Sequence, residues 1–390
     1  FFPPRSPPPP APPHVGPPGP PAAPRPPAPP PPTPARRFAL WLALSAVPSG
    51  LMLSTTTHLT TDVFAMPLLW VIPLGLYLLS FTLAFSDRAW LARPFLALAP
   101  VLILLAGGLA MMPAGNATMA IAVSGVALLF VVSVTLHARL YALRPEPDRL
   151  TLFYLALAIG GMLGGPFCPP LAPPVCDRPW AHPLLILAAA ALIPLPRWLD
   201  WRRLPGLAPE MTALTAATLF GFGLLCAWLL LLAWVDGDGA WLTWVWAGAL
   251  ALCGLGLAMW RWLYLPLLVP TMLALGGTYT VLDSWQGARS RSYFGIYTLR
   301  DYPEQHLRTL AHGTTLHGQQ YTDARRDLPG TYYGPSSGVG IVLAHAPRLA
   351  GPVARIGVVG LGAGTLACFA KPGQHWRFFE IDPAVLAFST

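Results

Sequence analysis

The glycine-rich stretch near the end of the chain has the residue spacing that most clearly points to chemistry. Residues 355–359 have the composition of a buried strand, and they run directly into a turn that contains Gly360, Gly362 and Gly364. Glycines let a backbone approach a ligand closely, and free amides at the start of a helix favour negative or polar groups. We therefore expect a strand, a ligand-binding turn and a helix that begins within the turn.

A second strand and an acidic residue complete this pattern. Residues 376–381 read as a strand that follows a break at 371–373, and Glu380 lies 20 residues after Gly360. At that offset an acidic side chain meets the hydroxyl pair of a ribose. The turn also satisfies the dinucleotide fingerprint through Ala367, so spacing alone leaves NAD and S-adenosylmethionine both open. The alternative is a glycine turn that binds nothing.

Short alternating runs precede this unit. Residues 293–299 and 306–310 alternate apolar and polar side chains and are separated by turn residues, which is typical of strands. We expect a small antiparallel sheet of two or three strands that ends near residues 331–335. Cys368, just after the glycine turn, is expected to be a core residue.

The composition of the whole chain indicates a membrane protein. Of 390 residues, 54% are hydrophobic and 10% are charged, against about 25% charged in a soluble domain. Apolar runs of about 17 to 24 residues are long enough to cross a bilayer as helices, and none alternates like a barrel strand. The eight predicted spans are 38–54, 64–85, 94–112, 117–136, 150–168, 183–199, 212–235 and 241–260, with a weaker candidate at 262–282.

Arginines gather in alternate loops, before the first span and after the second, fourth and sixth. Because cytoplasmic loops carry an excess of Lys and Arg, these loops are predicted to face the cytoplasm. The net charge of +8 then reflects topology, and we expect no nucleic-acid partner. The arginines concerned are Arg36, Arg37, Arg88, Arg93, Arg139, Arg144, Arg149, Arg197, Arg202 and Arg203.

The ninth candidate conflicts with this pattern. Arg261 would be cytoplasmic, so a full crossing of 262–282 would put everything after it outside. Prolines and glycines within the segment favour a broken or surface-lying helix. We therefore predict that 262–282 does not cross fully, that the protein is a multi-pass inner-membrane protein, and that its C-terminal domain is cytoplasmic.

Polar residues near the spans allow two interpretations. The hydroxyl-rich run 54–62, which includes His58 and Asp62, could form a pore, ion or substrate site. The preferred interpretation is a short external loop whose hydroxyls cap the second helix. The glycine cluster 160–165 is expected to permit close helix packing. Asn116 begins a glycosylation sequon.

The cysteines and the N-terminal tract add little chemistry. Cys168 and Cys176 share a loop and could form a disulfide, but no Cys or His spacing supports a metal site. The prolines from Pro3 to Pro34 predict a polyproline II or disordered linker over 1–36. A linker at the first residue suggests further sequence upstream.

These motifs resemble a family of bacterial multi-pass membrane proteins fused to a spermidine-synthase-like (aminopropyltransferase) domain. The likeness covers nearly everything after the proline tract. In the membrane part it rests on 55–62, 67–74, 153–155 and 160–165, and in the soluble part on 291–295, 312–320, 332–335 and 360–365.

The resemblance implies a polytopic helical region over 37–282, a small β-domain over 283–350, and the start of an α/β Rossmann-like domain of the S-adenosylmethionine class over 351–390. Gly360, Gly362 and Gly364 would line the nucleoside and Glu380 would hold its ribose. Two further residues, Gln320 and Tyr333, would face the cleft. The family's catalytic Asp would lie beyond Thr390, so we expect this 390-residue piece to be inactive and truncated.

Two positions depart from the family pattern. Where soluble spermidine synthases carry acidic residues, this chain has Ala363 in the glycine turn and His317 in the β-domain. The expected function is aminopropyl transfer from decarboxylated S-adenosylmethionine to a diamine, in polyamine metabolism. The alternatives are a polyamine or cation transporter or sensor with a regulatory nucleoside domain, and an S-adenosylmethionine methyltransferase. NAD is the less favoured ligand.

Overall fold

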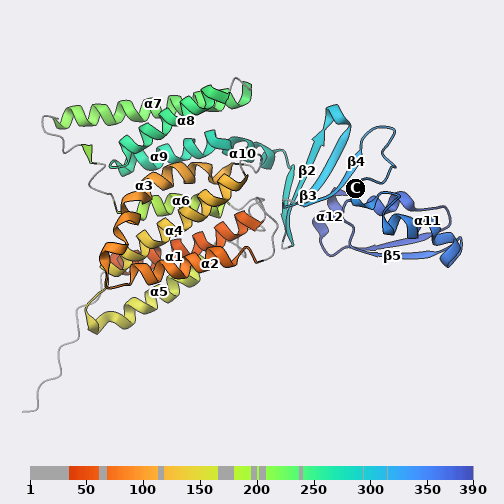
Figure 1. Ribbon diagram of the computed structural model, residues 1–390, viewed down its shortest axis with the longest axis horizontal. Helices are drawn as coiled ribbons and strands as arrows, with labels where there is room; N and C mark the ends of the chain where they lie inside the picture. The colour runs from red at the N-terminus through yellow and green to blue at the C-terminus, as the bar shows by residue number, and fades with distance from the viewer. Residues whose placement is uncertain are drawn as a thin grey trace, which may run out of the picture.

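The structure, a computed structural model, is mostly helical, with two small sheets after a helical bundle (Figure 1). It describes residues 35–60, 68–112, 118–165, 180–194, 200–201, 208–236, 240–292, 294–313 and 315–389. Several predicted features, namely the proline tract through residue 34, Asp62, Asn116 and the cysteines Cys168 and Cys176, lie outside these residues.

Each of the eight predicted spans contains a helix, and two further helices follow them. Their apolar side chains pack into two large buried clusters and one small one inside the described part of the bundle. The helices are α1 (Ala35–His58), α2 (Val71–Ala84), α3 (Arg93–Gly108), α4 (Thr118–Ala142), α5 (Leu150–Gly164), α6 (Ala181–Leu192), α7 (Pro209–Asp236), α8 (Ala240–Leu257), α9 (Arg261–Met272) and α10 (Thr278–Trp285).

Four helical segments among the described residues are long and apolar enough to cross a membrane. They are Ala35–His58, Met119–Ala142, Pro209–Ala233 and Arg261–Leu282. Several other helices are apolar but shorter, and the 12 residues of α6 extend only about 18 Å at 1.5 Å per residue. A hydrocarbon core is about 30 Å thick. The membrane character of the bundle is thus supported, while eight complete crossings remain a prediction.

The directions of four helices follow from two hydrogen bonds. Arg37 Nη2 donates to the carbonyl of Leu143 (3.2 Å), and Arg261 Nη2 donates to the carbonyl of Ile193 (2.8 Å). The starts of α1 and α9 therefore lie beside the ends of α4 and α6. We call this the arginine end of the bundle, defined by Arg37, Arg139, Arg144 and Arg261.

The segment after Arg261 differs from its prediction. Tyr264, Leu268 and Met272 are buried in the bundle, so α9 does not lie on a surface. A break does occur, in η7 (Leu273–Gly277), where Gly276 has φ 122°. Beyond it, Thr280 Oγ1 donates to the carbonyl of Met111 (3.1 Å), past the end of α3 and opposite the arginine end. The surface-lying prediction is wrong, because this kinked helix runs through the bundle.

Close packing of α1 on α5 confirms the role predicted for the glycine cluster. A Cβ on Gly164 would lie 2.4 Å from the Ala46 carbonyl oxygen, and one on Gly160 would lie 2.6 Å from that of Leu42. Only glycine allows the two backbones to approach this closely. Ser49 Oγ also donates across the pair, to the carbonyl of Gly161 (2.9 Å).

The polar run is helical rather than a capping loop, so that prediction is wrong for residues 54–60. Most of their hydroxyls, Thr55 excepted, donate back along the helix, for example Thr56 Oγ1 to the carbonyl of Met52 (2.8 Å). Such i−4 bonds keep a hydroxyl satisfied within an apolar bundle. Ser54, Thr55 and His58 are buried instead of facing an external loop.

The part of the chain after α10 contains a four-stranded antiparallel sheet and a two-stranded parallel sheet. The first has the order β1 (Arg289–Ser292), β2 (Gly295–Tyr302), β3 (Leu307–His312), β4 (Thr315–Tyr321). A helix that the sequence did not predict, α11 (Gly338–Ala350), follows and is capped by Ser337 Oγ. The second sheet pairs β5 (Arg355–Val359) with β6 (His375–Phe379), before α12 (Pro383–Phe388).

The helix predicted after the glycine turn is only a short 3-10 segment, η10 (Thr365–Phe369). Pro372 and Gly373 follow closely, and neither continues a helix, so no room remains for a full one. Cys368 is exposed on this short turn, and its prediction as a core residue is wrong.

Candidate functional site

The three glycines predicted to bind a ligand adopt backbone conformations that favour glycine. The φ angles are 88° at Gly360, 56° at Gly362 and 71° at Gly364. A Cβ on Gly360 or Gly362 would meet no atom within 4 Å, so space lies beside the backbone at both positions. The turn follows the end of β5, where parallel sheets characteristically bind ligands. This geometry permits a ligand to contact the main chain directly.

Glu380 is held against this turn by backbone amides. Its Oε1 accepts from Asp382 N (2.9 Å), and its Oε2 accepts from Leu361 N (2.7 Å). These two amides, Asp382 first, hold the pKa of Glu380 below its ordinary value. An ionised carboxylate offers about four lone-pair positions, so it can still accept from a pair of hydroxyls. The structure therefore joins all four predicted nucleoside residues in one place.

Strand β4 packs directly on the turn. A Cβ on Gly318 would lie only 2.2 Å from the Cβ of Ala363, so glycine is required where the two segments meet. Leu310 pairs with Gly318 while Ala311 pairs with Leu316, which makes His317 the extra residue of a β-bulge. Both positions that depart from the family pattern thus lie at this junction.

The two residues predicted to face the cleft, Gln320 and Tyr333, have weaker structural links to the glycine turn than Glu380 has. Gln320 is exposed on β4 and shares the strand face of Gly318, two residues earlier. Tyr333 ends η9 (Thr331–Tyr333) and contacts the ring of Tyr332, whose hydroxyl donates to the carbonyl of His317 (3.1 Å). Among the described residues, no hydrogen bond or ring contact joins Gln320 or Tyr333 to the glycine turn.

A buried polar cluster around Asp382, two residues after Glu380, was not predicted from the sequence. Asp382 is 1% exposed, accepts a hydrogen bond from Ser292 Oγ, and caps α12 by accepting from Ala384 N (2.9 Å). The ring of Tyr297 lies nearby and stacks on His312 at 4.8 Å. The cluster links the four-stranded sheet to the segment that carries Glu380. The sequence feature that could have pointed to this cluster is the Asp-Pro pair at the start of α12, because Asp at the N-cap followed by Pro is typical of a helix start.

Titration in this cluster follows from burial and hydrogen bonding. Burial, with the Asp382 carboxylate beside it, raises the pKa of Tyr297 to about 12. Burial also tends to raise the pKa of Asp382, but hydrogen bonds from Ser292 and Ala384 outweigh it and leave that pKa below its ordinary value. Asp382 is therefore ionised and Tyr297 neutral near pH 7. The cluster is suited to fixing the segment that carries Glu380.

A second buried polar group lies inside the bundle. The imidazoles of His58 and His182 stack with centroids 5.3 Å apart, and Ser54 Oγ lies 3.0 Å from His182 Nδ1. Thr55 is 1% exposed, and its Oγ1 has no hydrogen-bond partner in the part of the chain that the structure describes. The sequence placed His58 in a polar run but gave no sign of His182 as its neighbour.

The site holds no candidate metal centre among the described residues, because no three His, Cys, Asp or Glu side chains gather there. Comparison with known proteins adds no relative: no protein-family model, curated protein or solved structure matches the chain. The resemblance to spermidine-synthase-like membrane proteins thus rests on the sequence motifs alone.

Proposed function

We propose that this protein is a membrane-bound, spermidine-synthase-like transferase whose glycine turn binds decarboxylated S-adenosylmethionine or S-adenosylmethionine. The observation that carries the proposal is the position of Glu380, which is bonded to Leu361 N within a turn of open glycines. In this assignment Glu380 accepts the two ribose hydroxyls, while the backbone near Gly360 and Gly362 contacts the nucleoside. The two strands and their crossover form the first part of a Rossmann-like unit.

The proposed chemistry is transfer of an aminopropyl group from a sulfonium donor. The nitrogen lone pair of a diamine attacks the donor carbon next to sulfur, and a C–N bond forms as the C–S bond breaks. The electron pair of the broken bond goes to sulfur, which becomes a neutral thioether, and the amine loses a proton to a base. The described residues of this chain would bind and orient the donor, and none of them is assigned as that base.

A second transferase chemistry, methyl transfer, is favoured by two residues. Ala363 provides no carboxylate in the glycine turn, and His317 provides none in β4. Without these acids a diamine has fewer anionic partners at the junction, which supports methyl transfer from S-adenosylmethionine as the alternative.

A transporter or sensor is favoured by a different observation. Ionisable side chains inside a membrane are costly and often mark substrate or proton pathways. The stacked pair of His58 and His182 is such a feature, with Ser54 as its hydrogen-bond partner. In this alternative the bundle moves or detects a cation, and the nucleoside site regulates it.

For location, we propose an inner-membrane protein whose arginine end faces the cytoplasm. The direction of α9 and α10 supports a C-terminal region on the opposite side, and Figure 1 shows α10 leading to the sheets at the bundle end farther from the start of α1. This proposal replaces the cytoplasmic C-terminal domain expected from the sequence. It requires that the nucleoside donor be supplied on that side.

Calorimetric titration of the purified protein in nanodiscs separates these candidates. We expect binding of S-adenosylmethionine or its decarboxylated form, weakened at least about tenfold by Glu380→Gln, a loss of about 1.4 kcal/mol. Glu304→Gln, an exposed carboxylate outside the site, is the matched control and should leave affinity unchanged. Binding of NAD alone would exclude both transferase candidates.

A further inference from the structure

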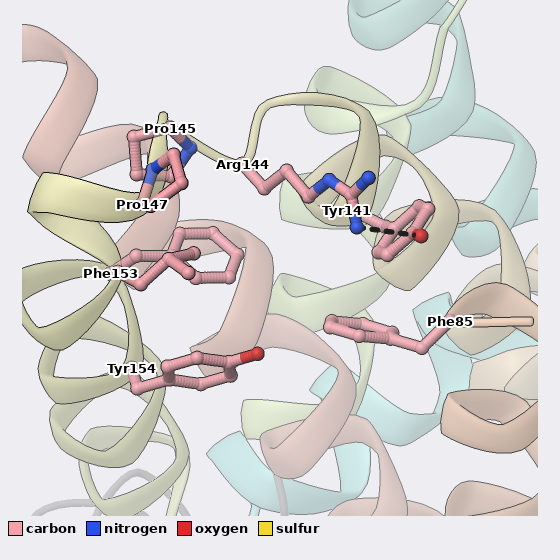
Figure 2. Close-up of a pocket in the computed structure, with 8 residues that line it drawn as sticks. Phe85, Tyr141, Arg144, Pro145, Pro147, Phe153 and Tyr154 are labelled. Atoms are coloured by element: carbon pink, nitrogen blue, oxygen red, sulfur yellow. Dashed lines mark hydrogen bonds between the residues drawn. The ribbon is translucent and has the colours of Figure 1, made fainter.

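A cavity of about 210 Å³ lies at the arginine end of the bundle, between α2, α4 and the start of α5. This volume is below the roughly 300–1,000 Å³ of pockets for drug-sized ligands, so it suits a small headgroup. Figure 2 shows the α5 rings on one side, with Phe85 and Tyr141 across from them and Arg144 above. The side chains that matter here are Phe85, Tyr141, Arg144, Pro147, Phe153 and Tyr154.

Among the described residues, Arg144 is the one charged side chain that lines the cavity. Its Nη1 donates to the Tyr141 hydroxyl (2.7 Å), and its guanidinium carbon lies 4.4 Å from the centre of the Tyr141 ring. These contacts fix the guanidinium while leaving other N–H donors for a ligand. Glu146 and Asp148 belong to the same loop but do not line the cavity. No salt bridge within the described ranges pairs Arg144 with a carboxylate.

The remaining walls are aromatic. Phe153 is 1% exposed and forms part of the bundle core, whereas Tyr154 is 56% exposed on the outer side of α5. An amphiphile could therefore place its polar group at Arg144 and its apolar part along Tyr154, toward the surrounding lipid. Tyrosine and arginine side chains of this kind favour the headgroup level of a bilayer.

We propose that this cavity binds the headgroup of an anionic phospholipid, with the lipid phosphate on Arg144. Basic pockets between membrane helices on the cytoplasmic side commonly bind anionic headgroups. A diamine is disfavoured here because Arg144 would repel it, so this site is separate from the proposed transferase. A soluble phosphate ester has the same charged group, but the lipid-facing Tyr154 favours the lipid.

Native mass spectrometry of the detergent-purified protein tests the proposal. With phosphatidylglycerol and phosphatidylcholine added in equal amounts, we expect the protein to retain phosphatidylglycerol at least about fivefold better. Arg144→Gln should abolish this preference, whereas Arg93→Gln, at the same end but outside the cavity, should keep it.

Three results would overturn the proposal: equal retention of both lipids by the wild type, an unchanged preference in Arg144→Gln, or complete displacement of phosphatidylglycerol by millimolar glycerol 3-phosphate. The last result would identify a soluble phosphate ester as the ligand. If Arg144→Gln does not fold, Arg144→Lys provides the second measurement. Lysine keeps the positive charge but lacks the planar, paired N–H donors of the guanidinium. The preference for phosphatidylglycerol should therefore fall without vanishing.

Discussion

At the scale of single residues, Glu380 carries most of the functional argument. Two amide hydrogen bonds orient its carboxylate, and Asp382, two residues later, fixes the segment by capping α12. The bonds from Leu361 and Asp382 favour the ionised form of Glu380 and lower its pKa. Their contribution is fully present above the unfolded pKa of about 4.3, and it is lost as pH falls through the lower folded value.

The hydrogen bond from the Leu361 amide to Glu380 predicts that this amide is protected from hydrogen exchange in a pH-dependent way. The Leu361 amide should exchange more slowly with deuterium than its intrinsic rate at neutral pH, and this protection should decrease below about pH 4. Glu380→Ala should lower the protection at neutral pH by roughly fivefold, about 1 kcal/mol for a part-buried charged hydrogen bond, and remove its pH dependence. Hydrogen–deuterium exchange of peptides covering 358–364 measures this. Equal protection in both forms at all pH values would contradict it, and Glu304→Ala is the control.

The grouping of the glycine turn with Glu380 was predictable from the sequence, whereas the contacts around it were not. Gly360, Gly364 and Glu380 are related by short spacings along one chain segment, which a sequence displays directly. The cluster of Ser292 and Asp382 joins residues 90 positions apart, and only folding brings them together. His58 and His182 were missed as a pair for the same reason.

At the scale of elements, hydrophobic run length predicted where helices lie but not where they end. The short helix α6 and the kink at Gly276 depend on packing and local backbone conformation rather than composition. The hydroxyl residues of 54–60 resemble loop residues in composition, yet helix carbonyls accept hydrogen bonds from Thr56, Thr57 and Thr60. The glycine cluster was predicted correctly because close approach of helices requires residues without a Cβ.

The α1–α5 contact can be tested by adding one methyl group. Gly164→Ala places a Cβ 2.4 Å from the Ala46 carbonyl oxygen, and such overpacking typically costs about 1–3 kcal/mol. We expect a lower thermal unfolding midpoint for the detergent-solubilised protein. Gly125→Ala, in α4 with no atom within 4 Å of the added Cβ, should not lower it. Equal effects of the two substitutions would show that the α1–α5 contact is not tight.

The buried histidines provide a test of the transport alternative. If the bundle moves a polyamine, proteoliposomes should take up labelled spermidine above the level of empty liposomes, and His182→Ala should reduce uptake at least about tenfold. His345→Ala, on the exposed side of α11, should have no effect. Uptake at the level of empty liposomes would remove this candidate.

At the scale of the whole molecule, helix direction decides on which side of the membrane the proposed nucleoside site lies. Arg37 and Arg261 both lie at the arginine end, and the segment from Arg261 then runs through the bundle to the opposite end. We therefore expect a protease-accessible tag after Thr390 to lie on the other side from a tag inserted in the loop at 144–149. If protease added outside right-side-out vesicles cleaved neither tag, the C-terminal region would lie in the cytoplasm. That result would contradict the direction of α9 and α10.

The central claim is that an adenosyl nucleoside binds at the glycine turn, and photoaffinity labelling tests it most directly. The full chain in nanodiscs would be illuminated with a photoreactive S-adenosylmethionine analogue, and the labelled peptide located by mass spectrometry. We predict labelling within 356–382, blocked by excess S-adenosylmethionine and reduced by Glu380→Gln. Labelling only within the helical bundle, or none that excess ligand blocks, would contradict the account.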